Sequence, residues 1–369
     1  MANCLTDRGD TMKNNVTIYD IAKRLGISPS TVSRVLNNSS HPVKQEVRER
    51  VLAAAKEMDY VLNAQARNLK KQMNPTVGVI LPSIANPFYP SIVRGIEDEA
   101  MRRNYYIAIS SCDKDPRRTD QYVQSMLEQN MRGIIAIYLE YLPQSLANYV
   151  QRGGQVISVV TDGVLCENAH NIVVDKVLEA RQAVEHLIGL GHRRIANLMN
   201  ELDSQLRRKR LEGYFTALKN AGIEIKKEYL YVYGQDIPGF GDESAESVKV
   251  GYELARKMLE RTPEVTGILC MNDMMALGVI KALRENGRQI PEDYSLVSFD
   301  DLFFADCIEP SLTTMRVEKY QWGKAMARYL FEILENPGAE SGTAMKVQKV
   351  LTPSALVVRG STAPPRCET

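Results

Sequence analysis

The sequence predicts an α/β protein with a small helical head at its N-terminus and two doubly wound lobes. Three observations lead to this fold class. Short amphipathic helices fill most of the first sixty residues, and from Thr76 onward apolar strands alternate with helices. This alternation runs through two successive series of similar size. Continuous apolar strands separated by helices indicate a parallel sheet covered on both faces, so two series indicate two such lobes.

Length and composition exclude several classes of protein. The 369 residues are 44% hydrophobic and 25% charged, which suits a folded chain of two or three domains. There is no apolar run of ~18 residues and no secretory signal in the N-terminal segment. Six scattered cysteines form no C-x-x-C pair, which is typical of reduced thiols. We therefore expect a cytoplasmic protein with no membrane segment, metal or cofactor.

The charge is distributed unevenly along the chain. Residues 1–74 contain 12 Lys and Arg against 7 Asp and Glu, whereas residues 75–369 contain 34 against 38. A basic head on a mildly acidic body is typical of a protein whose head meets a polyanion. A charge excess of this size is also common on solvated surfaces, so both interpretations stay open on charge alone.

Three short helices are expected in the head, residues 15–60. Thr17 is suited to cap the first helix, Gly26 to end it, and Ser28 with Pro29 to start the second. A third helix over 43–58 is expected to bury Val43, Val47, Val51, Leu52, Ala55 and Met58. The tight glycine turn between the first two helices predicts helix-turn-helix geometry.

The second helix is expected to expose Pro29, Ser30, Thr31, Ser33 and Arg34. Short polar groups around one Arg suit a helix that enters the major groove and contacts base edges. A small helical bundle with a solvated polar face is the alternative. The stretch 63–71 that follows is helix-prone but too short to be stable alone, which suggests a linker that orders only when held.

The body is expected to contain nine parallel strands with helices between them. The strands are predicted at 77–81, 106–110, 133–138, 156–160, 172–174, 195–199, 231–233, 267–271 and 295–299. The helices are predicted near 88–103, 117–129, 143–152, 176–189, 205–221, 243–261 and 273–286. Ligands of such folds bind at the carboxyl ends of the strands, which between two lobes means the cleft.

Specific motifs now identify a family. Residues 16–22 (VTIYDIA) and 28–37 (SPSTVSRVLN) closely resemble the DNA-binding head of the LacI/GalR family of bacterial repressors. The resemblance covers residues 16–362 with its motifs in order. It includes 77–80 (VGVI), 86–89 (NPFY), 94–97 (RGIE), 185–195 (EHLIGLGHRRI), 210–214 (RLEGY), 272–278 (NDMMALG), 298–301 (SFDD) and 310–314 (PSLTT).

The resemblance implies a domain organisation. Residues 15–60 would be the helix-turn-helix domain, 61–75 a hinge helix and linker, and 76–369 an effector-binding core like a type I periplasmic binding protein. Its N-lobe would comprise 76–161 and 319–346, and its C-lobe 162–318 and 347–362. The chain would cross between the lobes near 161–172, 316–320 and 345–350.

The resemblance also implies the DNA-binding mode, in which two heads of a homodimer bind a palindromic operator on double-stranded DNA. Leu69 of the hinge helix, with Ala66 beside it, would insert into the minor groove, where an apolar wedge bends the duplex; an ordinary linker role is the alternative. Pro29, Ser30 and Arg34 would contact bases, although Pro29 departs from relatives with a larger residue there. The remaining positions, most of them for phosphate contacts, are Thr17, Tyr19, Ser28, Thr31, Ser33 and Asn37.

The effector implied by the resemblance is a small molecule, most simply a carbohydrate. By position its ligands would be Ser83, Asn86, Phe88, Asp113, Arg210, Asn272 and Asp300. Carboxylates and amides bind paired hydroxyls, Arg binds an oxygen or an anion, and an aromatic ring covers an apolar sugar face. Asn272 as a helix cap and Asp300 as a strand-end turn are the structural alternatives. Trp322 is expected to pack in the core or at a dimer contact, with ligand stacking as its alternative. Asp162 and the segment 235–241 are further candidates at the cleft rim.

Rival functions lack their signatures. The chain has no G-x-G-x-x-G after its first strand, no Walker A loop and no G-x-S-x-G, so no catalytic residues are assigned and an enzyme is not expected. A transport binding protein would share the core but needs a signal peptide and no DNA-binding head. An architectural DNA protein would lack the lobes. The sequence thus predicts an allosteric transcriptional regulator, with inducible repressor, corepressor-dependent regulator and activator left open.

Overall fold

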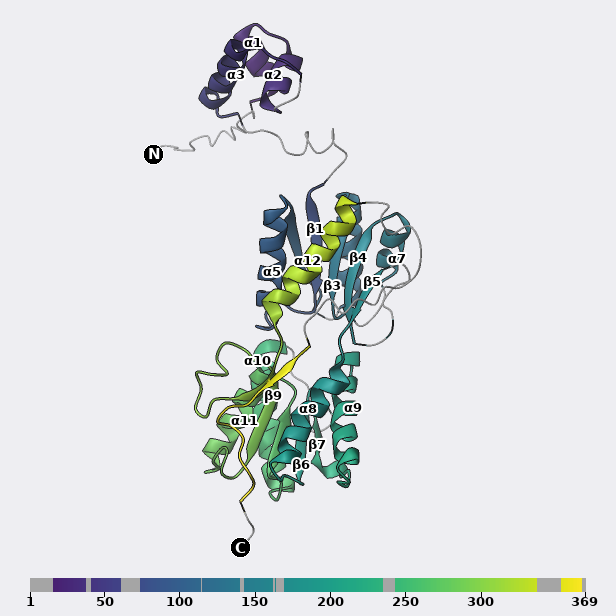
Figure 1. Cartoon of the computed structure of the whole chain (residues 1–369), viewed down its shortest axis with the longest axis vertical. Coiled ribbons are helices and arrows are strands. Elements are labelled where there is room, and N and C mark those ends of the chain that lie inside the picture. Colours follow the sequence, from purple (N-terminus) through teal and green to yellow (C-terminus); the bar gives the residue numbers. More distant parts are fainter. Residues whose placement is uncertain are drawn as a thin grey trace, which may run out of the picture. The chain divides into compact units, whose positions relative to one another are not determined.

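The computed structural model describes residues 16–37, 41–60, 74–113, 115–139, 143–161, 163, 169–234, 243–336 and 353–366. The chain divides into two compact units, Met1–Met73 and Asn74–Thr369 (Figure 1). Among the helices in these ranges, none combines the length and the apolar character needed to cross a membrane.

The first unit contains three helices, as expected. They are α1 (Ile18–Leu25), α2 (Pro29–Leu36) and α3 (Gln45–Glu57). Each contributes to one small core, whose buried members are Ile21, Ala22, Val32, Val35, Val51, Ala54 and Ala55.

Capping residues define where α1 and α2 begin. The Thr17 hydroxyl accepts from the Asp20 amide, and the Asp20 carboxylate accepts from the Thr17 amide at 2.8 Å, which forms a capping box. Gly26 ends α1 with a φ of +65°, a conformation that glycine adopts without strain. Ser28 caps α2, and Pro29 occupies its first position, where no amide hydrogen is needed.

One prediction for the third helix is wrong. Leu52 keeps 50% of its surface exposed, whereas Ala54 is buried. The buried side of α3 follows Val51, Ala54 and Ala55 at helical spacing. Leu52 is offset by one residue, about 100° around the helix from Val51, and therefore points out of the core.

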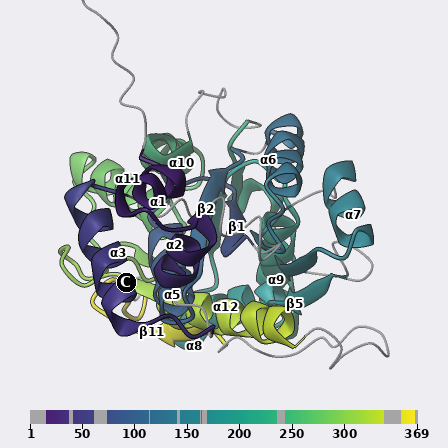
Figure 2. The same cartoon turned by 90° about the horizontal axis from the view of Figure 1, so that it is seen from above.

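The first sheet of the second unit is parallel and has the strand order β2-β1-β3-β4-β5. Its strands are β1 (Thr76–Leu81), β2 (Tyr106–Ser111), β3 (Gly133–Ile137), β4 (Gln155–Val160) and β5 (His170–Val173). The helices are α5 (Tyr89–Arg102), α6 (Pro116–Glu128), α7 (Gln144–Gln151) and α12 (Lys319–Glu335). α5 and α12 cover one face of this sheet and α6 and α7 the other (Figure 2).

The second sheet has the strand order β11-β10-β9-β8-β6-β7. Its strands are β6 (Ile195–Met199), β7 (Leu230–Val232), β8 (Gly267–Cys270), β9 (Ser295–Asp300), β10 (Thr313–Arg316) and β11 (Ala355–Val357). The helices are α8 (Lys176–Gly189), α9 (Gln205–Asn220), α10 (Glu243–Arg261) and α11 (Asp273–Glu285), with a 3₁₀ turn at Lys227–Tyr229. α8 and α9 pack on one face, and α10 and α11 pack on the other.

α12 packs very closely on α5 because glycines face the neighbouring backbone. A Cβ atom on Gly95 of α5 would lie 2.1 Å from the Tyr320 carbonyl oxygen of α12. A Cβ atom on Gly323 would lie 2.0 Å from the Ile92 carbonyl oxygen of α5. Neither position accepts a side chain without moving a helix, so α12 is an integral layer of the first lobe.

The boundary between the lobes differs from the prediction. The sequence assigned 162–318 to the second lobe, but β5 pairs with β4, from Ile157 with His170 to Val160 with Val173. The first lobe therefore extends through β5, and the chain enters the second lobe at α8. Two strands were not predicted: β10 joins the second sheet, and β11 joins β10 antiparallel. The predicted crossing near 345–350 falls outside the described residues.

Candidate functional site

The exposed side of α2 presents the polar groups predicted to meet DNA. Ser30 and Arg34 are exposed and lie one helical turn apart, while Val32 and Val35 are buried in the core of the head. Within the described part of the chain, Arg34 has no ion-pair partner. An exposed guanidinium without an ion-pair partner can donate two parallel hydrogen bonds to one guanine.

The neighbouring hydroxyls are held in a small network. The Ser28 hydroxyl lies 2.8 Å from both the Ser30 and the Thr31 hydroxyl oxygens. The Asn37 amide donates to the Ser33 carbonyl oxygen at 2.8 Å and to its hydroxyl at 3.2 Å. The other predicted DNA-binding positions are Thr17 and Tyr19, which are exposed, and Pro29, which is half-buried.

Several predicted positions lie outside the described residues. Ala66 and Leu69 of the hinge, Asp162 after the fourth strand and the segment 235–241 all belong to this group.

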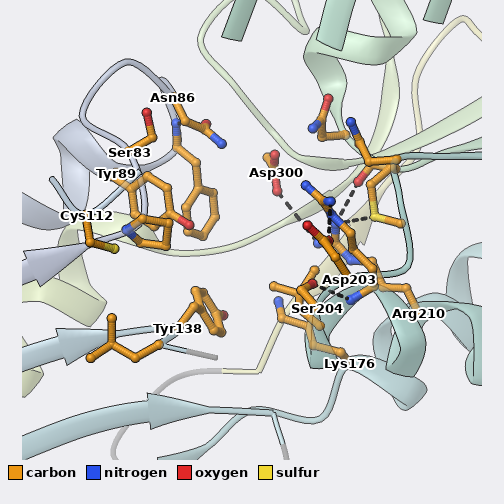
Figure 3. A pocket seen from close by; sticks show the side chains of 18 residues that line it. Ser83, Asn86, Tyr89, Cys112, Tyr138, Lys176, Asp203, Ser204, Arg210 and Asp300 are labelled. Atoms are coloured by element: carbon orange, nitrogen blue, oxygen red, sulfur yellow. Dashed lines mark hydrogen bonds and ion pairs between the residues drawn. The ribbon is translucent and has the colours of Figure 1, made fainter. Parts of the chain in front are cut away.

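A cavity of about 350 Å³ lies between the two sheets of the second unit (Figure 3). Its lining comes from segments that follow the carboxyl ends of the parallel strands, as expected for this fold. The first lobe contributes Pro82, Ser83, Asn86, Phe88, Tyr89, Cys112, Tyr138 and Leu139. The second lobe contributes Lys176, Asn200, Asp203, Ser204, Leu206, Arg207, Arg210, Met271, Asn272 and Asp300.

The structure brings together six of the seven predicted effector residues. Ser83, Asn86, Phe88, Arg210, Asn272 and Asp300 all line the cavity.

The prediction needs correction for Asp113. Its carboxylate is about half-exposed, pairs with Arg118 and accepts from the Ser111 hydroxyl at 2.7 Å. The residue before it, Cys112, is buried and lines the cavity instead. Consecutive side chains at the end of a strand point in different directions, and the sequence pattern did not distinguish these two.

Local hydrogen bonds also hold some of these side chains. The Asn272 side chain caps α11 by accepting from the Met275 amide at 2.8 Å. Asn272 therefore acts as a helix cap, as the alternative proposed, and also lines the cavity. Asn86 likewise accepts from the Phe88 amide at 2.9 Å. Asp300 ends β9 with a φ of +109°, an unusual backbone conformation for a residue with a side chain.

A cluster of buried charges forms part of the cavity wall. The Glu179 carboxylate accepts from Lys176 Nζ at 2.5 Å and from Arg210 Nη2 at 2.9 Å. Arg210 also donates to the Met271 carbonyl oxygen at 2.6 Å, and its guanidinium lies 4.0 Å from the Phe299 ring centroid. Asp300 Oδ1 is 3.7 Å from Arg210 Nη2. Removing one member would leave a buried charge uncompensated.

Burial and ion pairing shift the pKa values of these charged groups in opposite directions. Burial by itself would raise the pKa of Glu179, but Lys176 and Arg210 bring this pKa below its usual value. Burial lowers the pKa of Lys176, and Glu179 opposes that change. Burial raises the pKa of Asp300, although Arg210, Lys319 and Lys176 oppose this. Asp300 is therefore the carboxyl of the cluster that most readily holds a proton.

A further buried carboxyl, Asp273, begins α11 directly after the cavity residue Asn272. It accepts hydrogen bonds from the Ser298 hydroxyl, the Thr314 hydroxyl and the Leu302 amide. Burial and the nearby Asp300 nevertheless raise the pKa of Asp273 to about 7. In the unfolded chain its pKa would be near 3.8, so folding favours the protonated form.

This shift predicts a pH dependence of stability. The stabilisation from protonated Asp273 is complete below about pH 4 and is lost as the pH rises toward 7, with a slope of up to ~1.4 kcal/mol per pH unit. Asp273→Asn should remove this contribution to the pH dependence, because the Asn side chain does not titrate. Its amide can still accept from the Leu302 amide and donate to the Ser298 and Thr314 hydroxyls. Denaturant titrations of both proteins between pH 5 and pH 8 measure the difference. Parallel curves would show that Asp273 titrates normally.

Among the cavity-wall residues that sequence reasoning missed, Tyr138 and Lys176 have the most polar or charged groups buried at the site. Tyr138 directly follows β3 and Lys176 begins α8 after β5, so both lie at strand ends and this position was an available signal. The Tyr138 hydroxyl is buried and has no hydrogen-bond partner among the described residues. Trp322 is buried in the core of the first lobe, in agreement with its predicted packing role.

The head and the second lobe match known families. Residues 17–63 match the model described as bacterial regulatory proteins, lacI family, and residues 184–362 match a periplasmic binding protein-like domain. The ribose operon repressor of Escherichia coli (strain K12) is 30% identical over 94% of this chain and 99% of its own length.

Solved structures of transcriptional regulators are similar to nearly the whole chain. The lac repressor dimer bound to operator and the anti-inducer ONPF is 28% identical, with a TM-score of 0.76, over 95% of this chain and 100% of that chain. The complex of the transcriptional regulator CelR with cellobiose is 28% identical, with a TM-score of 0.65, over 94% and 99% of the two chains. These similarities extend through the head and both lobes, and this chain belongs to the LacI family of bacterial DNA-binding transcriptional regulators.

Proposed function

We propose that this chain is a cytoplasmic repressor whose affinity for its operator is controlled by a carbohydrate-type effector in the cavity between the lobes. The observation that carries the proposal is the composition of the cavity wall. Carboxylate, guanidinium and amide groups from the second lobe face aromatic rings from the first. This combination suits a ligand with paired hydroxyl groups and an apolar ring face.

Each half of the wall has a defined task. Asp300 and Asn272 accept from and donate to ring hydroxyls, and Arg210 donates to a ring or substituent oxygen. Phe88 and Tyr89 meet edge to face, with ring centroids 5.2 Å apart, and offer an apolar surface. The ribose operon repressor and the CelR–cellobiose complex support a carbohydrate effector by their names.

The effector acts through linkage between two sites. A ligand that contacts both lobes favours one angle between them, and this angle sets the separation of the two hinge helices in a homodimer. Hinge order and operator affinity then change together. The same coupling with the opposite sign would make the ligand a corepressor.

Selection of bound duplexes from a random DNA pool, at two salt concentrations, tests the DNA-binding half of this proposal. We expect a pseudo-palindrome with a flexible central step, because two heads bind symmetric half-sites. Recovery without a consensus, with affinity that collapses as salt rises, would mean contacts to phosphates only and would contradict operator recognition.

Leu69→Ala tests the proposed hinge wedge. It should weaken binding to the selected operator far more than binding to a scrambled duplex, since only the bent specific complex gains from an inserted side chain. Fluorescence anisotropy on both duplexes gives the two losses. Equal losses would exclude insertion of Leu69 between bases.

A further inference from the structure

One end of the cavity contains buried hydrogen-bond donors that lack acceptors. Lys176 Nζ has three N–H bonds, and within the described residues only the Glu179 carboxylate accepts one of them. Lys176 is only 1% exposed and lines the cavity, so its further partners come from the cavity. The Tyr138 ring centroid lies 5.8 Å from Lys176 Nζ, and the Tyr138 hydroxyl is also buried without a partner (Figure 3). Buried donors of this kind call for ligand oxygens.

The charges at this end do not balance. Lys176 and Arg210 are two buried cations that share the single carboxylate of Glu179. The second carboxylate, Asp300, forms a longer ion pair with Arg210, at 3.7 Å. A third cation, Lys319, donates to the Asp300 and Asp301 carbonyl oxygens.

The size of the imbalance indicates the charge of the missing group. The cations of this cluster are Lys176, Arg210 and Lys319, and its carboxylates are Glu179 and Asp300. Three positive and two negative charges leave one positive charge, which a single ligand carboxylate neutralises. A phosphate monoester, with nearly two negative charges, would need further donors such as a free helix N-terminus. The N-terminus of α8 is already capped, because the Asp175 carboxylate accepts from the Leu178 amide at 2.8 Å.

We propose that the effector is a sugar acid, and that its carboxylate binds between Lys176, Arg210 and Tyr138. This inference rests on the proposed function of the cavity as the effector site and makes it more specific. Lys176 is then the residue that selects acids over neutral sugars.

Matched pairs of sugars test this selection directly. Isothermal titration calorimetry of the full chain would use glucose with glucuronate, galactose with galacturonate, and mannose with mannuronate, together with gluconate and glucose 6-phosphate. We expect at least one acid to bind between about 10-fold and 150-fold tighter than its neutral partner, the range for hydrogen bonds to a charged group. The same acid should change the affinity of the full chain for its selected operator.

Variants then assign the selection to the lysine. Lys176→Met keeps the aliphatic stem and should reduce the preference for the acid to a few-fold. Glu179 retains Arg210 in this variant, and the double variant Lys176→Met, Glu179→Gln removes one charge of each sign as a second, charge-balanced background. In both variants the preference for the acid should fall to a few-fold or less. Lys226→Met, at an exposed position outside the cavity, is the control and should bind like the unaltered protein.

The possible outcomes separate the inference from the proposed function. Neutral sugars that bind as tightly as their acids would overturn the sugar-acid inference but leave a carbohydrate effector in place. Much tighter binding of glucose 6-phosphate would overturn the assignment of a carboxylate. If no sugar of any class binds or alters operator affinity, the carbohydrate effector fails and this inference fails with it. An acid preference that survives in both Lys176 variants would remove Lys176 from the site.

Discussion

Asp300→Asn should abolish the effector response while operator affinity without effector stays unchanged. The carboxylate lies at the cavity wall near Arg210, and exchanging it for an amide removes a charged acceptor for ligand hydroxyls. The loss of one buried charged partner is expected to weaken effector binding by about 30-fold or more. Asn is the suitable replacement because it tolerates the positive φ of this position. Lys319 keeps its contact, which is to the backbone carbonyl.

The measurement is operator affinity as a function of the tightest-binding sugar or sugar acid. In the variant this curve should be flat over the range in which the unaltered protein responds. Asp306→Asn is the matched control, because its side chain is largely exposed and outside the cavity. A normal response in Asp300→Asn would remove Asp300 from the effector site.

Arg34→Ala should remove much of the discrimination between operator and random DNA. The side chain is exposed on α2 and can donate a pair of hydrogen bonds to guanine, a contact worth ~1–3 kcal/mol of discrimination. We therefore expect about 5-fold to 150-fold weaker binding to the selected operator for each head, with a much smaller loss on a scrambled duplex.

Competition binding on the two duplexes at fixed salt measures this ratio. Lys56→Ala on α3 removes the same charge from another exposed position of the head and should lower both affinities only slightly. Equal weakening on both duplexes by Arg34→Ala would mean that Arg34 contacts phosphates and carries no sequence information.

Local signals predicted most of the fold. The capping residues Thr17 and Ser28, with Gly26 between them, define α1 and α2 by contacts within a few residues. The alternation of apolar strands and helices likewise predicted nine strands close to their observed positions. In contrast, local sequence does not determine which strand β5 pairs with, and the short β10 and β11 carry little periodicity of their own.

The candidate site was predictable to the extent that position after a strand determines it. Asn86, Asn272 and Asp300 were predicted from the family resemblance, and each lies after a strand at the cavity wall. The prediction of Asp113 was off by one residue from Cys112, which lines the cavity. The ion cluster was not predictable, because Arg210 lies 31 residues from Glu179 along the chain and meets it only through tertiary packing.

The position of α12 has a consequence for how the protein is made. The first lobe is built from residues up to β5 and from α12, which is separated from β5 by the strands and helices of the second lobe. On a ribosome that adds roughly 5–20 residues per second, the face that α5 and α12 share stays only partly covered for roughly 7–30 s, until α12 is synthesised. During this interval the growing chain presents an apolar surface to chaperones. The two lobes therefore complete their folding together, and a fragment ending before α12 would contain an unfinished first lobe.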